Sequence, residues 1–174
     1  MGTGRRRGVF GDIFESLLVA VILALVIRFF VFQPFYIPSG SMEPTLLTGD
    51  RIIVSKFSYY FSEPERGDVV VFKYPRDPKR VFVKRVVALG GETVAIKDGQ
   101  LYIDGVLVPE EYIPARVSYP DFGPVRVPEG KLFMLGDNRA NSDDSRVWGF
   151  LDEDLLIGKA VAVYWPVSRI GSVD

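Results

Sequence analysis

Apolar residues fill positions 13–32 almost without a break, whereas the rest of the chain alternates in short runs. A helix of about 20 apolar residues can cross a hydrocarbon core of about 30 Å. Glu15 and Arg28 interrupt the stretch only near its ends, where charged side chains can reach the membrane interface. The pattern therefore predicts a single transmembrane signal anchor over residues 13–32, behind a short cytoplasmic tail of residues 1–12.

The residues on either side of this stretch favour one orientation. Arginines at positions 5–7 precede it, and positive charge is enriched on the cytoplasmic side of a membrane span. A cleaved signal peptide would need a small-residue site after the apolar run, but the bulky sequence QPFY follows at 33–36. A buried core helix is the other alternative. We expect an uncleaved anchor, with residues 33–174 forming a domain outside the cytoplasm.

After the anchor, short runs rich in β-branched residues predict strands at 51–56, 68–74, 81–89, 93–97, 100–103, 106–108, 131–135 and 159–165. Asp98-Gly99 and Asp104-Gly105 separate such runs and are typical of hairpin turns. The proline-rich stretch 110–130 is read as a loop within a small hairpin excursion around 92–131, and 153–156 as one helical turn. The expected fold is mainly β: one transmembrane helix, then an antiparallel β-sheet domain.

Composition narrows the chemistry. Lys and Arg number 21 and Asp and Glu 22, without the basic excess typical of nucleic-acid binding. The chain has no cysteine and no histidine, which excludes thiolate nucleophiles, Ser-His-Asp triads and sites built on Cys or His ligands. An enzyme of this composition must transfer protons through a lysine, a tyrosine or a carboxylate. No cofactor and no metal are expected.

The segment PSGSMEPTL, residues 38–46, could present a serine. Its glycine and prolines keep the backbone irregular, so that a hydroxyl can lie beside open amide N–H groups. An ordinary linker between the anchor and the domain is the alternative. Met42 and Leu46 count against a linker, because a solvated segment has no need of apolar residues.

The run VFVKRVVALGGE, residues 81–92, places a lysine among apolar residues. Alternation predicts four residues on one face of the strand: Phe82, Lys84, Val86 and Ala88. Burial would lower the pKa of Lys84, and a shift of about two to three units raises its neutral fraction about 10²–10³-fold. An edge-strand lysine that blocks aggregation is the alternative. Lys56 and Lys159 also lie in strand-like runs, so spacing alone does not select Lys84.

The segment GDNRANSDDSRVWGF, residues 136–150, is dense in polar residues. It is not an EF-hand, because with Asp137 at position 1 Ser142 occupies the glycine position and Trp148 the glutamate position. A solvated loop is one interpretation. Its arginines among aspartates favour an ordered ion-pair network instead. The three segments together offer a serine, a lysine and a polar loop, as a histidine-free hydrolase requires.

Five sequence motifs follow one another along the chain: PSGSMEPTL, GDRIIVSK, GDVVVF, KRVVALGGE and GDNRANSDDSR. In their sequence and order they resemble the bacterial type I signal peptidases (leader peptidases), which are membrane-anchored serine proteases with a Ser–Lys dyad. The resemblance implies that Ser41 is the nucleophile and Lys84 the general base. It implies an oxyanion hole from the Ser39 side chain and the Ser41 N–H. Ser142 would hydrogen-bond the lysine, and Asp144 and Arg146 would form a supporting ion pair. The implied substrate pockets are lined by Ile37, Pro38, Met42, Leu46, Phe82 and Val83.

The same resemblance implies a function. The protein would remove signal peptides from exported preproteins, cleaving after small-x-small sites at the outer face of the cytoplasmic membrane. Its partners would be preproteins, the lipid bilayer and the secretion translocon, with no nucleic acid. There are two alternatives. One is a related Ser–Lys protease such as a self-cleaving repressor, and the other is an inactive domain that only binds exported polypeptides. A penicillin-binding hydrolase is excluded, because Ser-x-x-Lys occurs nowhere in the chain.

Overall fold

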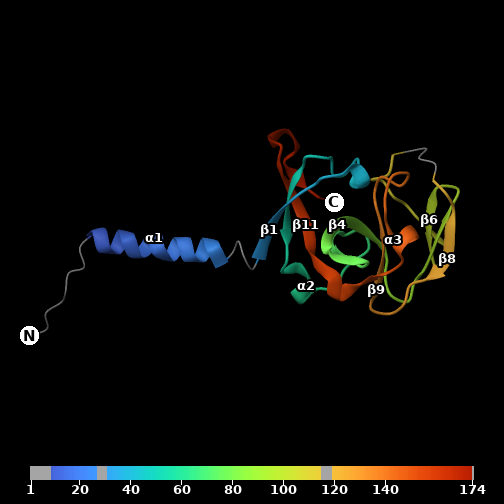
Figure 1. Cartoon of the computed structure of the whole chain (residues 1–174), viewed down its shortest axis with the longest axis horizontal. Coiled ribbons are helices and arrows are strands. Elements are labelled where there is room, and N and C mark those ends of the chain that lie inside the picture. The colour runs from blue at the N-terminus through green and yellow to red at the C-terminus, as the bar shows by residue number, and fades with distance from the viewer. Residues whose placement is uncertain (1–8, 27–30, 115–118, 174) are drawn as a thin grey trace, which may run out of the picture.

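A computed structural model describes residues 9–26, 31–114 and 119–173 of the chain. Helix α1 (Val9–Val26) projects from a β-rich body in Figure 1. Across the described ranges, no helix reaches the length and apolarity that crossing a membrane requires. The expected anchor corresponds to α1 only in part, because its residues 27–30 lie outside the described ones, as do the arginines at 5–7. Phe32, its last expected residue, is instead the first residue of strand β1.

The larger sheet is antiparallel and runs in the order β1-β2-β11-β3-β4-β9-β10, with β12 beside β11. Because β11 lies between β2 and β3, the C-terminal part of the chain passes through the middle of the sheet (Figure 1). The bounds are β1 Phe32–Tyr36, β2 Arg51–Ser55, β3 Val69–Tyr74, β4 Asp77–Ala88, β9 Lys131–Leu135, β10 Leu151–Asp152, β11 Leu156–Trp165 and β12 Gly171–Ser172.

Strand β3 is buried on both faces, which explains its unbroken apolar run VVVF. Val69 and Val71 pack into one hydrophobic cluster with residues that follow β1, while Val70 and Phe72 pack into a second cluster with Trp148. The larger sheet therefore lies between two apolar layers. Strand β4 is the neighbour of β3 and runs between the same two layers.

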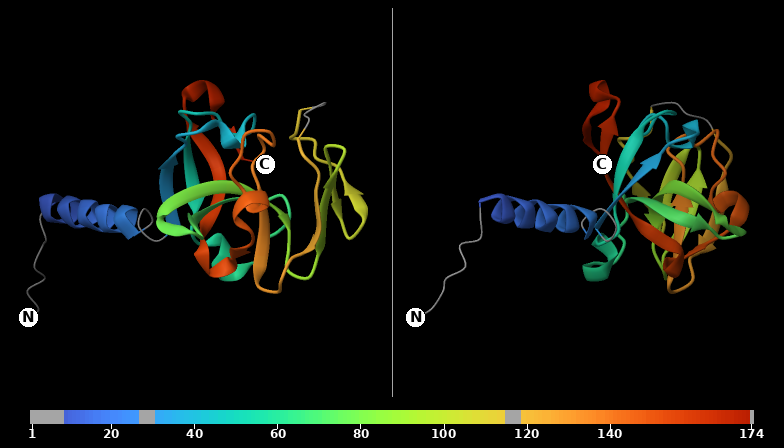
Figure 2. Two further views of the ribbon diagram at one scale, coloured as in Figure 1. Left: turned by 45° about the vertical axis from the view of Figure 1, so that its right-hand side comes forward. Right: turned by 60° about the vertical axis from the view of Figure 1, so that its left-hand side comes forward.

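A second, four-stranded sheet has the order β7-β6-β5-β8 and packs over a third cluster that includes Val87, Phe133 and Leu135 of the larger sheet. Figure 2 shows it as a separate layer beside the larger sheet. Its strands are β5 Thr93–Lys97, β6 Gln100–Ile103, β7 Val106–Val108 and β8 Phe122–Arg126. Asp98-Gly99 and Asp104-Gly105 connect its hairpins with positive φ at all four residues, as the sequence predicts.

All eight expected strands are present, with shifts of a few residues at their ends, and the helical turn expected at 153–156 is the 3-10 turn η3 (Glu153–Leu155). The reading of 110–130 as a loop was wrong in part, because β8 lies inside it and pairs with β5. Gly123 and Pro124 interrupt the apolar pattern of β8, so the sequence did not predict this strand. The short helices are α2 (Ser58–Phe61), α3 (Ser145–Trp148), η2 (Gly40–Met42) and η4 (Val167–Arg169).

The alternation expected along 81–89 holds only as far as Val86. Phe82 and Val86 pack into the cluster of Trp148, on the face that also carries Lys84. The pairing of β4 with β9 then shifts register between Val86 and Ala88, and Ala88 packs into the cluster under the second sheet. A β-bulge redirects the side chains beyond it, so the register change carries the strand from one layer to the other.

Candidate active site

A cleft of about 640 Å³ lies between the chain that follows β1 and strand β4. It is lined by residues 35–41 and 80–84, together with Val71, Asn141 and Asp143. Of the residues expected in substrate pockets, Ile37, Pro38, Phe82 and Val83 line this cleft. A groove between two extended segments can hold a peptide as an added strand.

Met42 and Leu46 do not lie among the lining residues of the cleft. Both are 0% exposed and belong to the hydrophobic cluster that also contains Ile37. This explains why a serine-rich segment carries two apolar residues. They anchor the turn that bears Ser41 in the core instead of facing a substrate.

Ser41 lies in the middle of the short 3-10 turn η2. Two bonds from Asn138 hold this turn from outside: its backbone N–H donates to the Ser41 carbonyl at 3.1 Å, and its side-chain amide donates to the Gly40 carbonyl at 3.0 Å. A Cβ at Gly136 would stand 2.4 Å from the Ser41 carbonyl oxygen and 2.2 Å from Ser142 Oγ. Only glycine fits there, so the polar loop can approach the serine turn closely.

Lys84 reaches Ser41 from the neighbouring strand. Its side chain is buried, with the residue only 4% exposed, and Nζ lies 2.7 Å from Ser41 Oγ and 2.9 Å from the Val83 carbonyl oxygen. Burial lowers the pKa of Lys84 from 10.5 to about 8, against the opposing charges of Asp144, Asp143 and Asp137. A lysine with this pKa is partly neutral at neutral pH, so it can accept a proton from the hydroxyl it contacts.

The structure separates Lys84 from the two other strand lysines that the sequence could not exclude. Lys159 is paired with Asp68 at 2.5 Å, and its side chain is 37% exposed. Lys56 is half-buried and lines a second hollow with Tyr59 and Glu63, which adjoins the cleft at Phe35 and Val81. Of these three lysines, only Lys84 has an amine that hydrogen-bonds a serine hydroxyl within the part of the chain that the structure describes.

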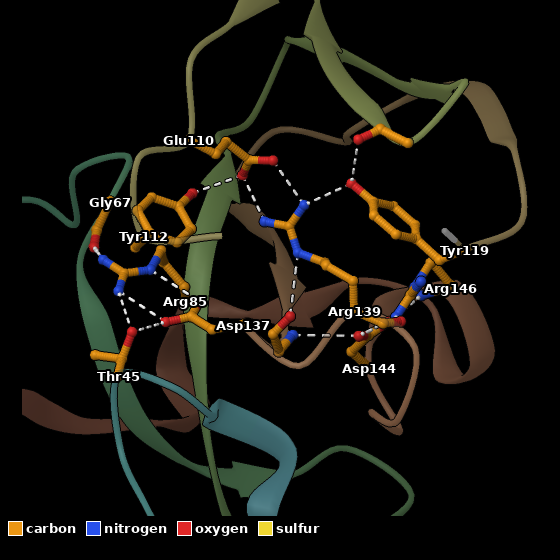
Figure 3. Close-up of polar contacts among 12 residues, drawn as sticks. Thr45, Gly67, Arg85, Glu110, Tyr112, Tyr119, Asp137, Arg139, Asp144 and Arg146 are labelled. Carbon is orange, nitrogen blue, oxygen red and sulfur yellow. Dashed lines mark hydrogen bonds and ion pairs between the residues drawn. The ribbon is translucent and has the colours of Figure 1, made fainter. Parts of the chain in front are cut away.

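The polar loop 136–146 is ordered by ion pairs, as its composition indicates. Asp144 accepts from Arg146 at 2.8 Å, which is the pair expected from the resemblance. Asp144 also accepts from the Gly136 N–H at 3.2 Å and stands at the N-cap of α3. Two other charged residues of the loop pair outside it (Figure 3): Asp137 with Arg85, and Arg139 with Glu110.

Arg85, Glu110 and Tyr112 are members of this network that the sequence did not single out. The ion pair of Arg85 joins residues 52 positions apart and that of Glu110 residues 29 apart, and the Tyr112 ring covers Arg85, so no local pattern marks these contacts. The one available signal was an arginine beside Lys84 in the middle of an apolar strand, where a cation requires a partner.

Ser142 does not hydrogen-bond the lysine here. Its Oγ is buried and finds no hydrogen-bond partner among the described residues. Ser39 has extended backbone at the start of the serine turn, and its hydroxyl makes no capping hydrogen bond to that turn. It lines the cleft together with Ser41. Among the described residues, no group of three or more His, Cys, Asp or Glu side chains is gathered to hold a metal ion.

Comparisons with known proteins agree on one family. The family model "Signal peptidase, peptidase S26" matches residues 10–165. "Probable signal peptidase I-1" of Synechocystis sp. is 48% identical over 166 residues, which cover 90% of this chain and 83% of that protein. "Signal peptidase I T" of Bacillus subtilis is 42% identical over 166 residues, covering 90% and 86%. The crystal structure of a signal peptidase I from Enterococcus faecalis superposes with a TM-score of 0.51 at 36% identity, covering 56% of this chain and 97% of that one.

Proposed function

The chain belongs to the signal peptidase family, peptidase S26, and from this premise we propose that Ser41 and Lys84 are the catalytic dyad of a signal peptidase I-type serine hydrolase. The observation that carries the proposal is the 2.7 Å contact between Ser41 Oγ and Lys84 Nζ in a cleft open to a peptide. A nucleophile and a base within hydrogen-bonding distance are the geometry that covalent catalysis requires.

Neutral Lys84 takes the proton of Ser41 as Oγ attacks the scissile carbonyl carbon, and a tetrahedral intermediate forms. The protonated lysine then gives that proton to the leaving amine, and the C–N bond breaks to leave an acyl-enzyme on Ser41. Water, deprotonated by the lysine, hydrolyses the ester and restores the serine. A base with a pKa of about 8 can both accept and return the proton near neutral pH.

The developing oxyanion is stabilised by the Ser39 hydroxyl and the Ser41 backbone N–H. Ser39 suits this role because it lines the cleft beside Ser41 and its hydroxyl is not engaged in capping the turn. Loss of one such donor typically lowers the rate about 10²–10³-fold. Asp144 and Arg146 hold the polar loop beside the dyad.

Exported preproteins are the substrates, and their cleavage-site segment lies in the cleft as an extended strand. The end of β1 and strand β4 both line the cleft, and a peptide added as a strand would point alternate side chains toward the protein. Ile37, Pro38, Phe82 and Val83 line the cleft together with Ser41. The resemblance to signal peptidases implies a preference for small side chains at the first and third positions before the cleaved bond.

We further propose that the apolar stretch from residue 13 to the start of β1 anchors the protein in the cytoplasmic membrane as a single span, with the N-terminus inside and the dyad on the outer side. The large apolar side chains of α1 support this, since Ile13, Phe14 and Leu17 are each more than 60% exposed. Exposed apolar surface of this kind is stable in lipid and unfavourable in water.

The direct test is cleavage of a preprotein by the purified full chain in detergent. We expect cleavage after an Ala-x-Ala sequence, measured by mass spectrometry of the two products. A matched preprotein with leucine at the first position before the bond should be cut at least about tenfold more slowly, because the added side chain does not fit a small pocket. Absence of cleavage of the Ala-x-Ala substrate would contradict the proposal.

The pH dependence of cleavage reports the base. Because Lys84 acts when neutral, kcat/KM should rise as the pH increases through the pKa of about 8 and should show no inflection near 6.5. About one Lys84 in ten is neutral at pH 7 and about nine in ten at pH 9, against one in a few thousand at pH 7 for an unperturbed lysine. A dominant inflection near pH 6 would point to a carboxylate base instead.

A further inference from the structure

The segment that leaves the second sheet after β7 returns toward the polar loop and buries a carboxylate against it. Glu110 binds the guanidinium of Arg139 with both oxygens, one of them 2.6 Å from Nη1, and the Glu110 side chain is only 8% exposed (Figure 3). Burial opposes the charge of Arg139, yet the hydrogen bonds and charge of Glu110 outweigh it and raise the pKa of Arg139. The pair is therefore a fixed ionic contact between the second sheet and loop 136–146.

Tyr112 adds a second contact two residues further along. Its hydroxyl donates to Glu110 at 2.6 Å, and its ring covers Arg85, whose Cζ lies 3.8 Å from the ring centroid. Burial, with the neighbouring charge of Glu110, raises the pKa of Tyr112, so its hydroxyl stays a donor. One short segment thus holds two buried arginines, one by an ion pair and the other by cation–π contact.

Both arginines connect to the dyad. Arg85 follows Lys84 on β4 and binds Asp137 through Nε at 3.0 Å and Nη2 at 2.8 Å. Asp137 in turn accepts from Thr45, four residues after Ser41, at 2.5 Å. The base strand, the polar loop and the serine segment therefore meet at one buried carboxylate.

Arg139 acts on the same loop from its other side. Its Nε donates to the Gly136 carbonyl at 3.1 Å, and the residue before it, Asn138, holds the Ser41 carbonyl. Displacement of Arg139 would therefore shift the contacts that fix the serine turn.

We propose that Glu110 and Tyr112 are positioning residues that hold Ser41 and Lys84 at reacting distance by clamping Arg139 and Arg85. The inference rests on the dyad proposed above and adds the second sheet to the machinery that serves it. Neither Glu110 nor Tyr112 lines the cleft. Their loss should therefore affect the chemical step and leave substrate binding unchanged.

The test compares single-turnover acylation by the full chain in detergent for wild type, Glu110→Gln, Tyr112→Leu and Tyr112→Phe. A displacement of about 1 Å at a catalytic pair can lower the rate about 10²-fold. We expect Glu110→Gln and Tyr112→Leu to lower the acylation rate constant at least about tenfold, with KM within about twofold. Tyr112→Phe keeps the ring over Arg85 and should lose less than Tyr112→Leu.

Glu111, which is exposed, and Tyr102, which is half-buried, provide the matched controls. Glu111→Gln removes an exposed carboxylate next to Glu110, and Tyr102→Phe removes a hydroxyl that bonds only locally to Gln100. Both should acylate as wild type does. The rate constant also separates positioning from loss of folded protein, since partial unfolding lowers the amplitude of the reaction and leaves its rate constant unchanged.

Rate constants within about twofold of wild type for Glu110→Gln and Tyr112→Leu would overturn the clamp while leaving the dyad intact. A parallel rise in KM would also overturn it, because it would place these residues in substrate binding. Should Glu110→Gln fail to fold, the two Tyr112 variants decide the question. If the wild-type protein itself fails to cleave, the proposed dyad is wrong, and the proposed clamp is wrong with it.

Discussion

Replacing Ser41 with alanine or Lys84 with methionine is expected to abolish preprotein cleavage while leaving the domain folded. The serine oxygen forms the covalent bond and the lysine receives its proton, and each step depends on the 2.7 Å contact between these two side chains. Removal of one member of such a unit costs on the order of 10⁴–10⁶-fold in kcat. Methionine fills much of the space of the buried lysine stem and needs no hydrogen bond, which limits the effect on stability.

The measurement is cleavage by each purified full-length variant, with circular dichroism to show that the β-fold persists. Lys56→Met is the matched control, because Lys56 is not among the residues that line the cleft of Ser41, and this variant should cleave at the wild-type rate. Cleavage by Ser41→Ala at an undiminished rate would contradict the dyad. It would favour the alternative in which the domain binds exported polypeptides and another protein cuts them.

The strands could be predicted where side chains alternate or where a run is buried on both faces. The apolar run of β3 and the hairpins at Asp98-Gly99 and Asp104-Gly105 are determined locally, by burial and by turn chemistry. Strand β1 was missed because its first residue continues the apolar stretch before it and Pro34 interrupts its pattern. Strands of this kind are stabilised by pairing, β1 with β2 and β8 with β5, and pairing partners are not visible in a local pattern.

The residues of the site were harder to predict from local sequence patterns than the strands were. Alternation placed Lys84 on an apolar face but treated Lys56 and Lys159 alike, and only the contact across 43 residues to Ser41 separates them. The roles of Ser41 and Lys84 came from the family resemblance. Glu110 gave no signal at all, because an acidic residue in a proline-rich stretch is ordinarily a solvated one.

The buried charges around the dyad are paired in a way that suits a lysine base. Asp144 and Asp137 both favour the protonated lysine, and each is bound to an arginine, Arg146 and Arg85. Burial outweighs the charges of Asp144, Asp143 and Asp137, so the pKa of Lys84 stays below that of a solvated lysine.

We expect the substitution Asp137→Asn to have the second large effect, on both the stability of the fold and the pKa of Lys84. The Arg85–Asp137 pair is buried, with side chains 2% and 0% exposed, and the substitution removes the carboxylate charge that faces this guanidinium in the core. Breaking a buried pair in this way typically costs about 3–5 kcal/mol of unfolding free energy. Because a negative charge near Lys84 is also removed, the pKa of Lys84 should fall further and the rise of activity with pH should move to lower pH.

Urea unfolding followed by tryptophan fluorescence measures the loss, since Trp148 lies in the buried cluster beside β3 and β4. Asp152→Asn is the matched control: its pair with Lys131 has side chains 55% and 36% exposed, and exposed pairs contribute about 0–1 kcal/mol. An Asp137→Asn variant no less stable than Asp152→Asn would show that Arg85 finds another buried partner. The connection between the base strand and the serine segment would then not depend on this carboxylate.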